Sequence, residues 1–177
     1  MKIIAFTGVS GVGKSTFLSA ARLQREFLHL IASELIKVEK SAYGSQLTSE
    51  DLRKGNIDKN QAALITAFDR HRASAEVPLV LDAHTIIDTP DGFRELPASV
   101  FAALCITGMV FLHASPEMIF EQRGRDTARV RPQRSIQQIA ELQDRSLLLA
   151  ADVTRTLGIP LTVLNQGNCV EFLQLLR

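Results

Sequence analysis

The sequence has few cysteines and almost no net charge, and each shortage argues against a class of protein. Its two cysteines, Cys105 and Cys169, lie far apart, without a Cys-x-x-Cys spacing or a cluster of histidines beside them. This argues against a disulfide scaffold and against a zinc finger. The formal net charge of +1 at pH 7 argues against a dedicated nucleic-acid or membrane-surface binder, because such proteins need a strongly basic face.

Long apolar runs are also missing. The longest, Val100–Ala114, is broken by Thr107 and Gly108 and is shorter than the roughly 20 residues of a membrane span. The apolar run after Met1 is too short for a signal peptide, and no small-residue cleavage site follows it. We therefore expect a cytoplasmic protein with no membrane partner.

No repeat, low-complexity segment or Pro/Gly/Ser-rich linker divides the chain, so we predict one domain over residues 1–177. A chain of this length buries roughly 70% of the surface that it exposes when unfolded. That is enough for a core without a metal or a disulfide.

Short apolar runs alternate with longer helical patterns, which indicates a parallel sheet with helices on both faces. Buried parallel strands are apolar almost throughout, as Pro78–Leu81 and Met109–Leu112 are. The expected fold is α/β, a three-layer sandwich around a five-stranded parallel sheet. The predicted strands are Lys2–Thr7, Phe27–Ile31, Val77–Leu81, Gly108–His113 and Pro160–Leu164. The predicted helices are Lys14–Arg25, Ala32–Lys40, Asp58–Ser74, Pro97–Cys105, Pro116–Arg123, Ser135–Leu157 and Cys169–Leu176.

A complete phosphate-binding loop (P-loop) follows the first strand. Gly8-Val9-Ser10-Gly11-Val12-Gly13-Lys14-Ser15 fits G-x-x-x-x-G-K-[ST] between an apolar strand and a helical pattern, and this context makes the match specific. Backbone N–H groups and the helix N-terminus form a positive concavity for phosphates. Lys14 is expected to contact the β- and γ-phosphates of ATP, and the Ser15 hydroxyl to ligate Mg²⁺. The predicted ATP-binding residues here are Gly8, Ser10, Gly11, Val12, Gly13, Lys14, Ser15 and Thr16.

A P-loop alone does not identify a reaction, because switches, motors and kinases all contain one. The sequence has no Asn-Lys-x-Asp element for guanine recognition, and it is short for a motor ATPase with its additional domain. A small kinase of the P-loop NTPase fold is therefore the economical interpretation.

A carboxylate follows the third predicted strand. Asp82 ends the apolar run Val77–Leu81 at the edge of the sheet where open α/β folds bind ligands. Asp82 is predicted to help hold Mg²⁺ and to act in catalysis, the alternative being a carboxylate that caps the next turn. His84, two residues further on, is a candidate acceptor-binding residue, the alternative being a histidine that only hydrogen-bonds the loop.

Residues 123–134 contain five arginines and one acid. The planar guanidinium binds phosphate oxygens in pairs and stays charged, and closing arginines stabilise the charge that phosphoryl transfer spreads. We therefore predict a short lid over residues 123–134, with a solvated basic turn or an RNA-binding patch as the alternatives. Arg123, Arg125 and Arg129 are candidate catalytic residues, the last two also as ATP ligands, and Arg131 is a candidate acceptor ligand.

The acceptor region is predicted between residues 32 and 75, where a P-loop kinase inserts its acceptor-binding segment. Ala42–Asn60 reads as a polar loop that contains Asp51-Leu52-Arg53-Lys54, and an amphipathic helix follows it. Arg53 is a candidate clamp for an acceptor phosphate, the alternative being a solvated arginine at a helix end. Leu164–Asn168, after the last strand, is placed by topology near the adenine of ATP.

Taken together, these motifs resemble the archaeal-type adenylate kinases, a branch of the P-loop nucleoside monophosphate kinases. The resemblance rests on residues 8–16, on Asp51-Leu52-Arg53-Lys54, on Asp82-Ala83-His84, on Thr89-Pro90-Asp91-Gly92-Phe93 with Leu96-Pro97, and on the spaced arginines from Arg123 to Arg131. It departs from the family at Pro132, where an acid is usual, and matches only loosely over Ser41–Asn60.

The resemblance implies a five-stranded sheet, a mobile acceptor segment around Arg53, a short arginine lid and trimers in some members. It also implies Mg²⁺-dependent, reversible transfer of the γ-phosphoryl of ATP to a nucleoside monophosphate, AMP in the first hypothesis. Two alternatives stay open. One is a P-loop kinase with another nucleotide or a small metabolite as acceptor, and the other is a regulatory ATP-binding module with slow ATPase activity.

Overall fold

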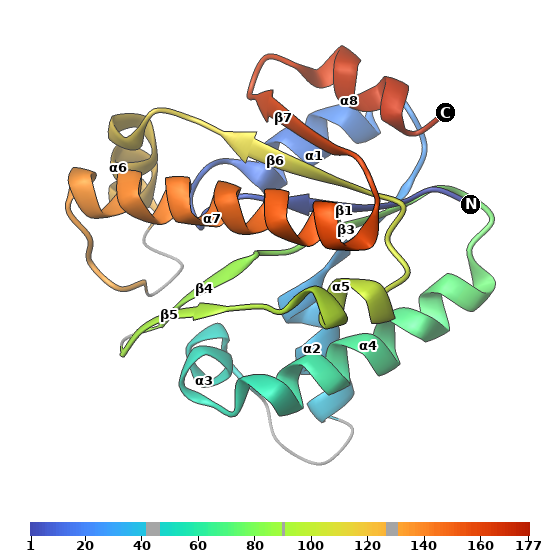
Figure 1. Cartoon of the computed structure of the whole chain (residues 1–177), viewed down its shortest axis with the longest axis horizontal. Coiled ribbons are helices and arrows are strands. Elements are labelled where there is room, and N and C mark those ends of the chain that lie inside the picture. Colours follow the sequence, from blue (N-terminus) through green and yellow to red (C-terminus); the bar gives the residue numbers. More distant parts are fainter. Residues whose placement is uncertain (42–46, 90, 127–130) are drawn as a thin grey trace.

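The framework of the molecule is a parallel sheet of five strands, seen in a computed structural model that describes residues 1–41, 47–89, 91–126 and 131–177 (Figure 1). The strands lie in the order β2-β3-β1-β6-β7, and every neighbouring pair is parallel. Their bounds are β1 Ile3–Thr7, β2 Leu28–Ile31, β3 Leu79–Asp82, β6 Gly108–His113 and β7 Leu161–Asn165. The five predicted strands are confirmed, with small shifts at their ends.

The predicted helices are also confirmed, and local capping explains several of their ends. Ser115 accepts a hydrogen bond from the Met118 N–H, with Pro116 in the first turn of α6, and Gly158 ends α7 in the left-handed conformation. The bounds are α1 Lys14–Arg22, α2 Ala32–Ser41, α4 Ile57–Ser74, α5 Ala98–Ala103, α6 Pro116–Arg125, α7 Ile136–Leu157 and α8 Cys169–Leu175. Within the described ranges, none of the helices is long and apolar enough to cross a membrane.

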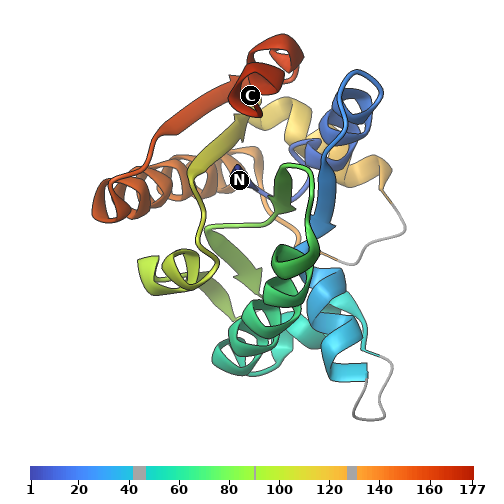
Figure 2. The ribbon, with the colours of Figure 1, turned by 90° about the vertical axis from the view of Figure 1, so that its right-hand side faces the viewer.

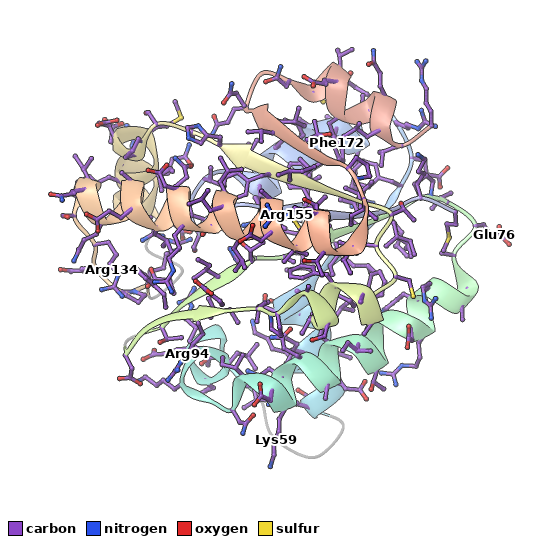
Figure 3. All side chains as sticks on the ribbon, viewed as in Figure 1. Lys59, Glu76, Arg94, Arg134, Arg155 and Phe172 are labelled. Carbon is purple, nitrogen blue, oxygen red and sulfur yellow. The ribbon has the colours of Figure 1, made fainter. Side chains whose placement is uncertain are left out.

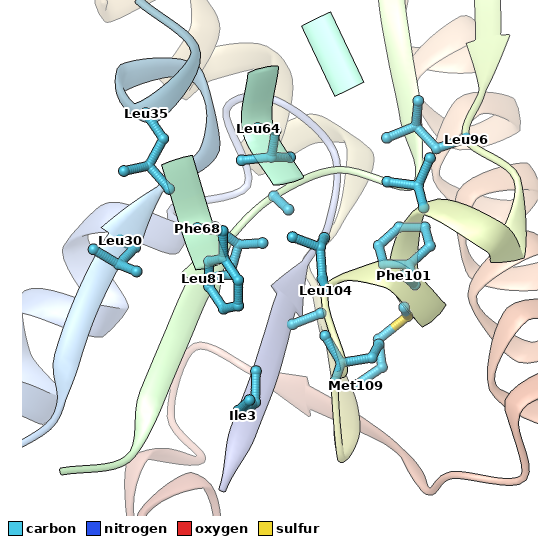
Figure 4. Packing of buried hydrophobic residues seen from close by; sticks show 14 of the residues in the cluster. Ile3, Leu30, Leu35, Leu64, Phe68, Leu81, Leu96, Phe101, Leu104 and Met109 are labelled. Atoms are coloured by element: carbon cyan, nitrogen blue, oxygen red, sulfur yellow. The ribbon is translucent and has the colours of Figure 1, made fainter. Parts of the chain in front are cut away.

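Alternate residues of the strands face the two sides of the sheet and build two cores. Ile3 and Ala5 pack with α2, α4, α5 and α7 in one cluster, of which Figure 4 shows a part. Ile4 and Phe6 pack on the other side, where Phe6 and Phe17 contact Phe172 of α8. Figures 1 and 2 show α1 and α8 on one side of the sheet and α2, α4 and α5 on the other. The predicted three-layer arrangement is thus observed.

One predicted loop is partly wrong. The polar loop expected over Ala42–Asn60 contains a short helix, α3 (Ser49–Lys54). Its start is fixed by a capping box, in which Thr48 Oγ1 accepts from the Asp51 N–H and Asp51 Oδ2 accepts from the Thr48 N–H. A helix of this length has too few residues to show a hydrophobic period, so the sequence pattern missed it.

A second sheet was not predicted. Strands β4 (Ile86–Thr89) and β5 (Gly92–Glu95) form an antiparallel hairpin after β3. Thr89 Oγ1 donates to the Gly92 carbonyl at 2.7 Å, and Gly92 has a φ of 127°, which few other residues tolerate. The hairpin contacts α3, so it lies between the predicted acceptor segment and the end of the main sheet (Figure 1).

Candidate active site

The P-loop connects β1 to α1 at the carboxyl edge of the main sheet. Gly11 and Gly13 have φ values of 88° and 96°, and a Cβ on either would lie 2.7 Å from Arg123 Cγ or Gln166 Nε2, respectively. Both positions therefore favour glycine for conformation, and Gly11 also for space, because Arg123 Cγ cannot move aside as easily as the end of the Gln166 side chain. Gly13 is the N-cap of α1 and offers no side chain to the first amides of the helix. Those amides are left to an external acceptor such as a phosphate.

Lys14 lies at the junction of the P-loop with β3. It is buried, and its Nζ donates to the Gly8 carbonyl at 3.2 Å and lies 3.6 Å from Asp82 Oδ1. The His84 Nδ1 is 3.5 Å from the same Nζ. The structure therefore brings Lys14 of the P-loop together with Asp82 and His84, which follow the third predicted strand.

His84 contacts the P-loop at the same carbonyl as Lys14. Its Nδ1 lies 2.8 Å from the Gly8 carbonyl, so the tautomer that fits carries its proton on Nδ1 and donates it there. Burial, and then the charge of Lys14, hold the pKa of His84 well below its ordinary value. A neutral His84 leaves Lys14 as the cation at this point.

His29, on β2, is a neighbour of this group that no sequence motif indicated. Its Nε2 lies 4.0 Å from Asp82 Oδ2, and this nitrogen is buried without a hydrogen-bond partner among the described residues. Burial is the main cause that lowers the pKa of His29, and Asp82 opposes it. Asp82 is thus flanked by Lys14 on one side and an imidazole on the other.

Ser15 and Asp82 are the oxygen donors suited to Mg²⁺ in the site. Both line the same cavity, Ser15 from the first turn of α1 and Asp82 from the end of β3. Across the described chain, no group of three or more His, Cys, Asp or Glu side chains could hold a metal. One hydroxyl and one carboxylate still fit Mg²⁺, because this ion keeps several waters and takes phosphate oxygens as further ligands.

Two arginines of the predicted lid contact the P-loop directly. Arg123, on α6, donates from Nε to the Ser10 carbonyl at 2.8 Å, and Arg131 donates from Nε to the Ser10 hydroxyl at 3.0 Å. Arg131 also pairs with Asp126 at 2.5 Å. Their side chains are only 9% and 7% exposed. Both guanidinium groups are therefore held at the mouth of the phosphate loop.

Some N–H donors of these two guanidinium groups have no hydrogen-bond acceptor among the described residues. Both Nη atoms of Arg123 and Nη1 of Arg131 are buried without a hydrogen-bond partner among the residues that the structure describes. Burial and the neighbouring Arg131, Arg134 and Arg53 lower the pKa of Arg123, while Asp88 raises it. Buried cations with unpaired donors are unfavourable unless an anion joins them, so this cluster favours phosphate binding.

The structure does not place the other two predicted arginines at the P-loop, for different reasons. The Arg125 side chain is 79% exposed and pairs with Glu121 one turn earlier on α6, so the structure does not bring it to the P-loop. It lies in the last turn of the helix, away from the buried Arg123. Arg129 falls outside the described residues.

A cavity of about 990 Å³ extends from the P-loop towards α4 and α5. Lys14, Asp82, His84 and Arg131 line it at one end, together with Arg53 of α3. Its deeper wall is apolar and comes from α2, α4, α5 and the β4–β5 hairpin. The apolar wall includes Ile31, Ile36, Leu52, Leu64, Ile86, Leu96, Val100, Phe101 and Leu104.

Gln61 is a polar side chain in this apolar wall, and the sequence analysis did not select it. It lines the cavity from α4, is 7% exposed, and its Oε1 is buried without a hydrogen-bond partner among the described residues. Asn60 beside it is satisfied, because its Nδ2 donates to the Leu52 carbonyl at 2.8 Å. Glutamine in an amphipathic helix is ordinary, so only the fold distinguishes Gln61 from a surface residue.

The loop after β7, predicted to lie near the adenine of ATP, contacts the P-loop. Gln166 donates from Nε2 to the Val12 carbonyl at 2.9 Å. Asn168 Oδ1 accepts from the Asn165 N–H and closes the turn that presents Gln166. The segment proposed for the adenine of ATP therefore lies beside the phosphate loop.

Comparison with known proteins places this site in a family. A family model described as an AAA domain matches residues 7–140, from the end of β1 into α7. The adenylate kinase of Pyrococcus furiosus is 30% identical over 146 residues, which cover 80% of this chain and 74% of that protein. The adenylate kinase of Saccharolobus islandicus is 31% identical over 146 residues, 74% of this chain and 73% of that protein.

Solved structures agree at the level of the fold. Shikimate kinase from Bacteroides thetaiotaomicron has 14% identity and a TM-score of 0.59, covering 98% of this chain and 96% of its own. A gluconokinase from Sinorhizobium meliloti has 20% identity and a TM-score of 0.51, covering 98% of this chain and 88% of its own. The family model spans the P-loop and the two arginines that contact it. The chain belongs to the archaeal-type adenylate kinase family of P-loop kinases and is an ATP-dependent phosphotransferase.

Proposed function

We propose that the chain is a nucleoside monophosphate kinase that transfers the γ-phosphoryl of ATP reversibly to AMP, with Mg²⁺. The observation that supports it best is the set of unpaired, buried guanidinium donors of Arg123 and Arg131 at the mouth of the P-loop. A cytoplasmic location, expected from the sequence, would supply both nucleotides.

On the donor side, the P-loop residues selected from the sequence surround the phosphates of ATP. The backbone from Gly8 to Thr16 supplies N–H donors, and Lys14 is placed to contact the β- and γ-phosphates. Ser15 and Asp82 would hold Mg²⁺, which when bound neutralises charge on those phosphates. Asp82 lies close enough to Lys14 to orient it before ATP arrives.

On the acceptor side, the shape and lining of the cavity favour a nucleobase. Arg53, His84 and Arg131 lie at its polar end, as an acceptor phosphate requires. A flat base fits the apolar wall, whereas the many hydroxyls of a sugar acid would be left unpaired against it. A glutamine amide forms paired hydrogen bonds with the edge of adenine, and Gln61 has a free buried oxygen for one of them.

The proposed reaction is an in-line displacement between the two nucleotides. An oxygen of the AMP phosphate attacks the γ-phosphorus of ATP, and the bond from that phosphorus to the β,γ-bridging oxygen breaks. The electron pair stays on the departing β-phosphate, so two molecules of ADP result. No general base is required, because catalysis consists of positioning and of stabilising charge with Lys14, Arg123 and Arg131.

The test is an acceptor panel. The purified chain is incubated with ATP and Mg²⁺ plus one of AMP, GMP, CMP, UMP, gluconate or shikimate, and ADP formation is followed. ADP formed with AMP and not with the sugar acids is the expected result. Another obligatory acceptor would overturn the AMP assignment, and ATP binding without any acceptor-stimulated turnover would favour the regulatory module.

Variants locate the activity in this site. Lys14→Ala should abolish acceptor-dependent ADP formation, while circular dichroism shows the fold retained. Lys2→Ala removes an exposed lysine from the opposite end of β1 and should leave turnover unchanged. Turnover that survives Lys14→Ala would contradict the placement of the site.

A further inference from the structure

The β4–β5 hairpin lines the acceptor cavity and also contacts the arginine segment, which comprises the described arginines Arg123, Arg131 and Arg134. Ile86, Ile87 and Leu96 of the hairpin region line the cavity. Asp88, the next residue along β4, contacts the arginines. Figure 3 shows Arg134 where α7 begins, the end of the arginine segment that this carboxylate contacts.

Asp88 binds two arginines at once. Its Oδ1 accepts from Arg134 at 2.9 Å from Nη2 and 3.3 Å from Nε, and its Oδ2 lies 3.6 Å from Arg123 Nη1. Arg134 also donates to the Thr89 carbonyl and lies over the Phe93 ring at 5.2 Å from its centroid. Asp88 is 8% exposed, so these charges interact with little screening by water.

The charges around Arg123 show why a carboxylate is needed there. Arg131, Arg134 and Arg53 all lower the pKa of Arg123, and Asp88 is the neighbour that raises it. Without that negative charge, the guanidinium groups would repel one another. Asp126 is already paired with Arg131 at 2.5 Å.

Asp88 and Arg123 form an ion pair without a hydrogen bond between them. At 3.6 Å, Asp88 Oδ2 and Arg123 Nη1 attract each other as charges but do not form a hydrogen bond. Both atoms are buried, and neither has a hydrogen-bond partner among the described residues. Arg123 Nε is meanwhile fixed to the Ser10 carbonyl. The Nη groups therefore remain available to a phosphate oxygen over the P-loop.

We propose that Asp88 is a positioning residue that holds Arg123 beside the P-loop and, by pairing with Arg134 as well, ties the arginine segment to the hairpin that lines the acceptor cavity. The part that concerns phosphoryl transfer rests on the proposed function. The placement of Arg123 for ATP binding does not depend on which acceptor is used.

The experiment is a double-mutant cycle between Asp88 and Arg123. Asp88→Asn keeps the shape of the side chain and removes its charge, and should lower kcat for AMP phosphorylation by roughly tenfold to a hundredfold, with a smaller change in KM. It should also weaken ATP binding, measured by calorimetry. If Asp88 acts through Arg123, adding Asp88→Asn to Arg123→Ala should produce no further loss in either quantity.

Two further variants separate positioning from folding. Glu95→Gln makes the same carboxylate-to-amide change on the same hairpin, where Glu95 pairs with Arg145 at an exposed site, and should leave kcat and ATP affinity unchanged. Asp88→Glu keeps the charge but moves the carboxylate by one methylene, and should fold and still lower kcat. If thermal denaturation shows that Asp88→Asn is unfolded, Asp88→Glu takes its place in the double-mutant cycle.

The outcomes distinguish this proposal from the proposed function. Losses that multiply in the double variant, or an Asp88→Asn enzyme equal to the unmodified chain, would overturn the role of Asp88. If the unmodified chain does not phosphorylate AMP, the double-mutant cycle measured in ATP affinity still tests whether Asp88 acts through Arg123. Non-additive losses would then support Asp88 while the acceptor assignment fails, and additive losses would overturn both.

Discussion

At the scale of single residues, Gly11 of the P-loop leaves space for the side chain of Arg123. A Cβ on Gly11 would lie 2.7 Å from Arg123 Cγ, and the Gly11 φ of 88° disfavours any side chain. Gly11→Ala should destabilise the fold by about 1–2 kcal/mol through backbone strain. It should also displace Arg123 and lower kcat by up to roughly a hundredfold. Thermal denaturation and steady-state kinetics measure the two effects.

Gly124, next to Arg123 on α6, provides the control. A Cβ there meets nothing within 4 Å and its φ is not positive, so Gly124→Ala should stabilise the helix by up to about 1 kcal/mol without changing kcat. Equal kinetic losses in both variants would contradict the packing argument.

The sequence was sufficient for residues that belong to a local pattern. The P-loop predicted Lys14, and the end of an apolar strand predicted Asp82, because these motifs combine residue type with position in an element. Asp88 had no such pattern, since its partner Arg134 is 46 residues away and the hairpin that carries Asp88 was not predicted. Gln61 was missed for the same reason, because its role depends on the cavity and not on its neighbours in the chain.

At the scale of elements, the short helix α3 depends on its capping box. Hydrogen bonds from Thr48 lower the pKa of Asp51 below its ordinary value of 3.8. The stabilisation of the folded state by the ionised Asp51 is therefore complete at pH values above 3.8, and it is lost as the pH falls through the lower pKa that Asp51 has in the folded state. Asp51→Asn should weaken the box at neutral pH, loosen Arg53 on the same helix, and raise KM for AMP several-fold while ATP affinity stays constant.

Asp58, an exposed acid in the first turn of α4, is the matched control for Asp51. Asp58→Asn should leave both constants unchanged. An NMR titration should give Asp51 a midpoint below its ordinary value of 3.8. A midpoint at or above that value would show that the capping box does not form in solution.

At the scale of the whole molecule, the near-zero net charge conceals how charge is distributed. Arginines from α3, α6 and the segment before α7 converge beside the P-loop, although they come from distant parts of the chain. Composition could not reveal this, because acids elsewhere balance the sum. The order of the strands in the sheet brings these segments together. The five apolar runs were enough to predict the strands of the main sheet, but they did not predict the β4–β5 hairpin, which lies between β3 and β6 in the chain.

The two faces of the sheet carry different cores, and each core contains a buried phenylalanine that can be tested. Phe172 is fully buried among Phe6, Phe17 and Phe27 on the face packed with α1, whereas Phe101 is 1% exposed on the opposite face and lines the proposed acceptor cavity. Phe172→Ala and Phe101→Ala should each lower the free energy of unfolding by about 3–5 kcal/mol in denaturant titrations.

Kinetics should then distinguish the two variants below their melting temperatures. Phe101→Ala enlarges the cavity wall and should raise KM for AMP, whereas Phe172→Ala should leave KM for AMP and ATP affinity as in the unmodified chain. The opposite pattern, a KM that rises only with Phe172→Ala, would place the acceptor on the other face of the sheet. Because both changes remove the same side chain from equally buried sites, a difference in KM reports the position of the acceptor and not the loss of stability.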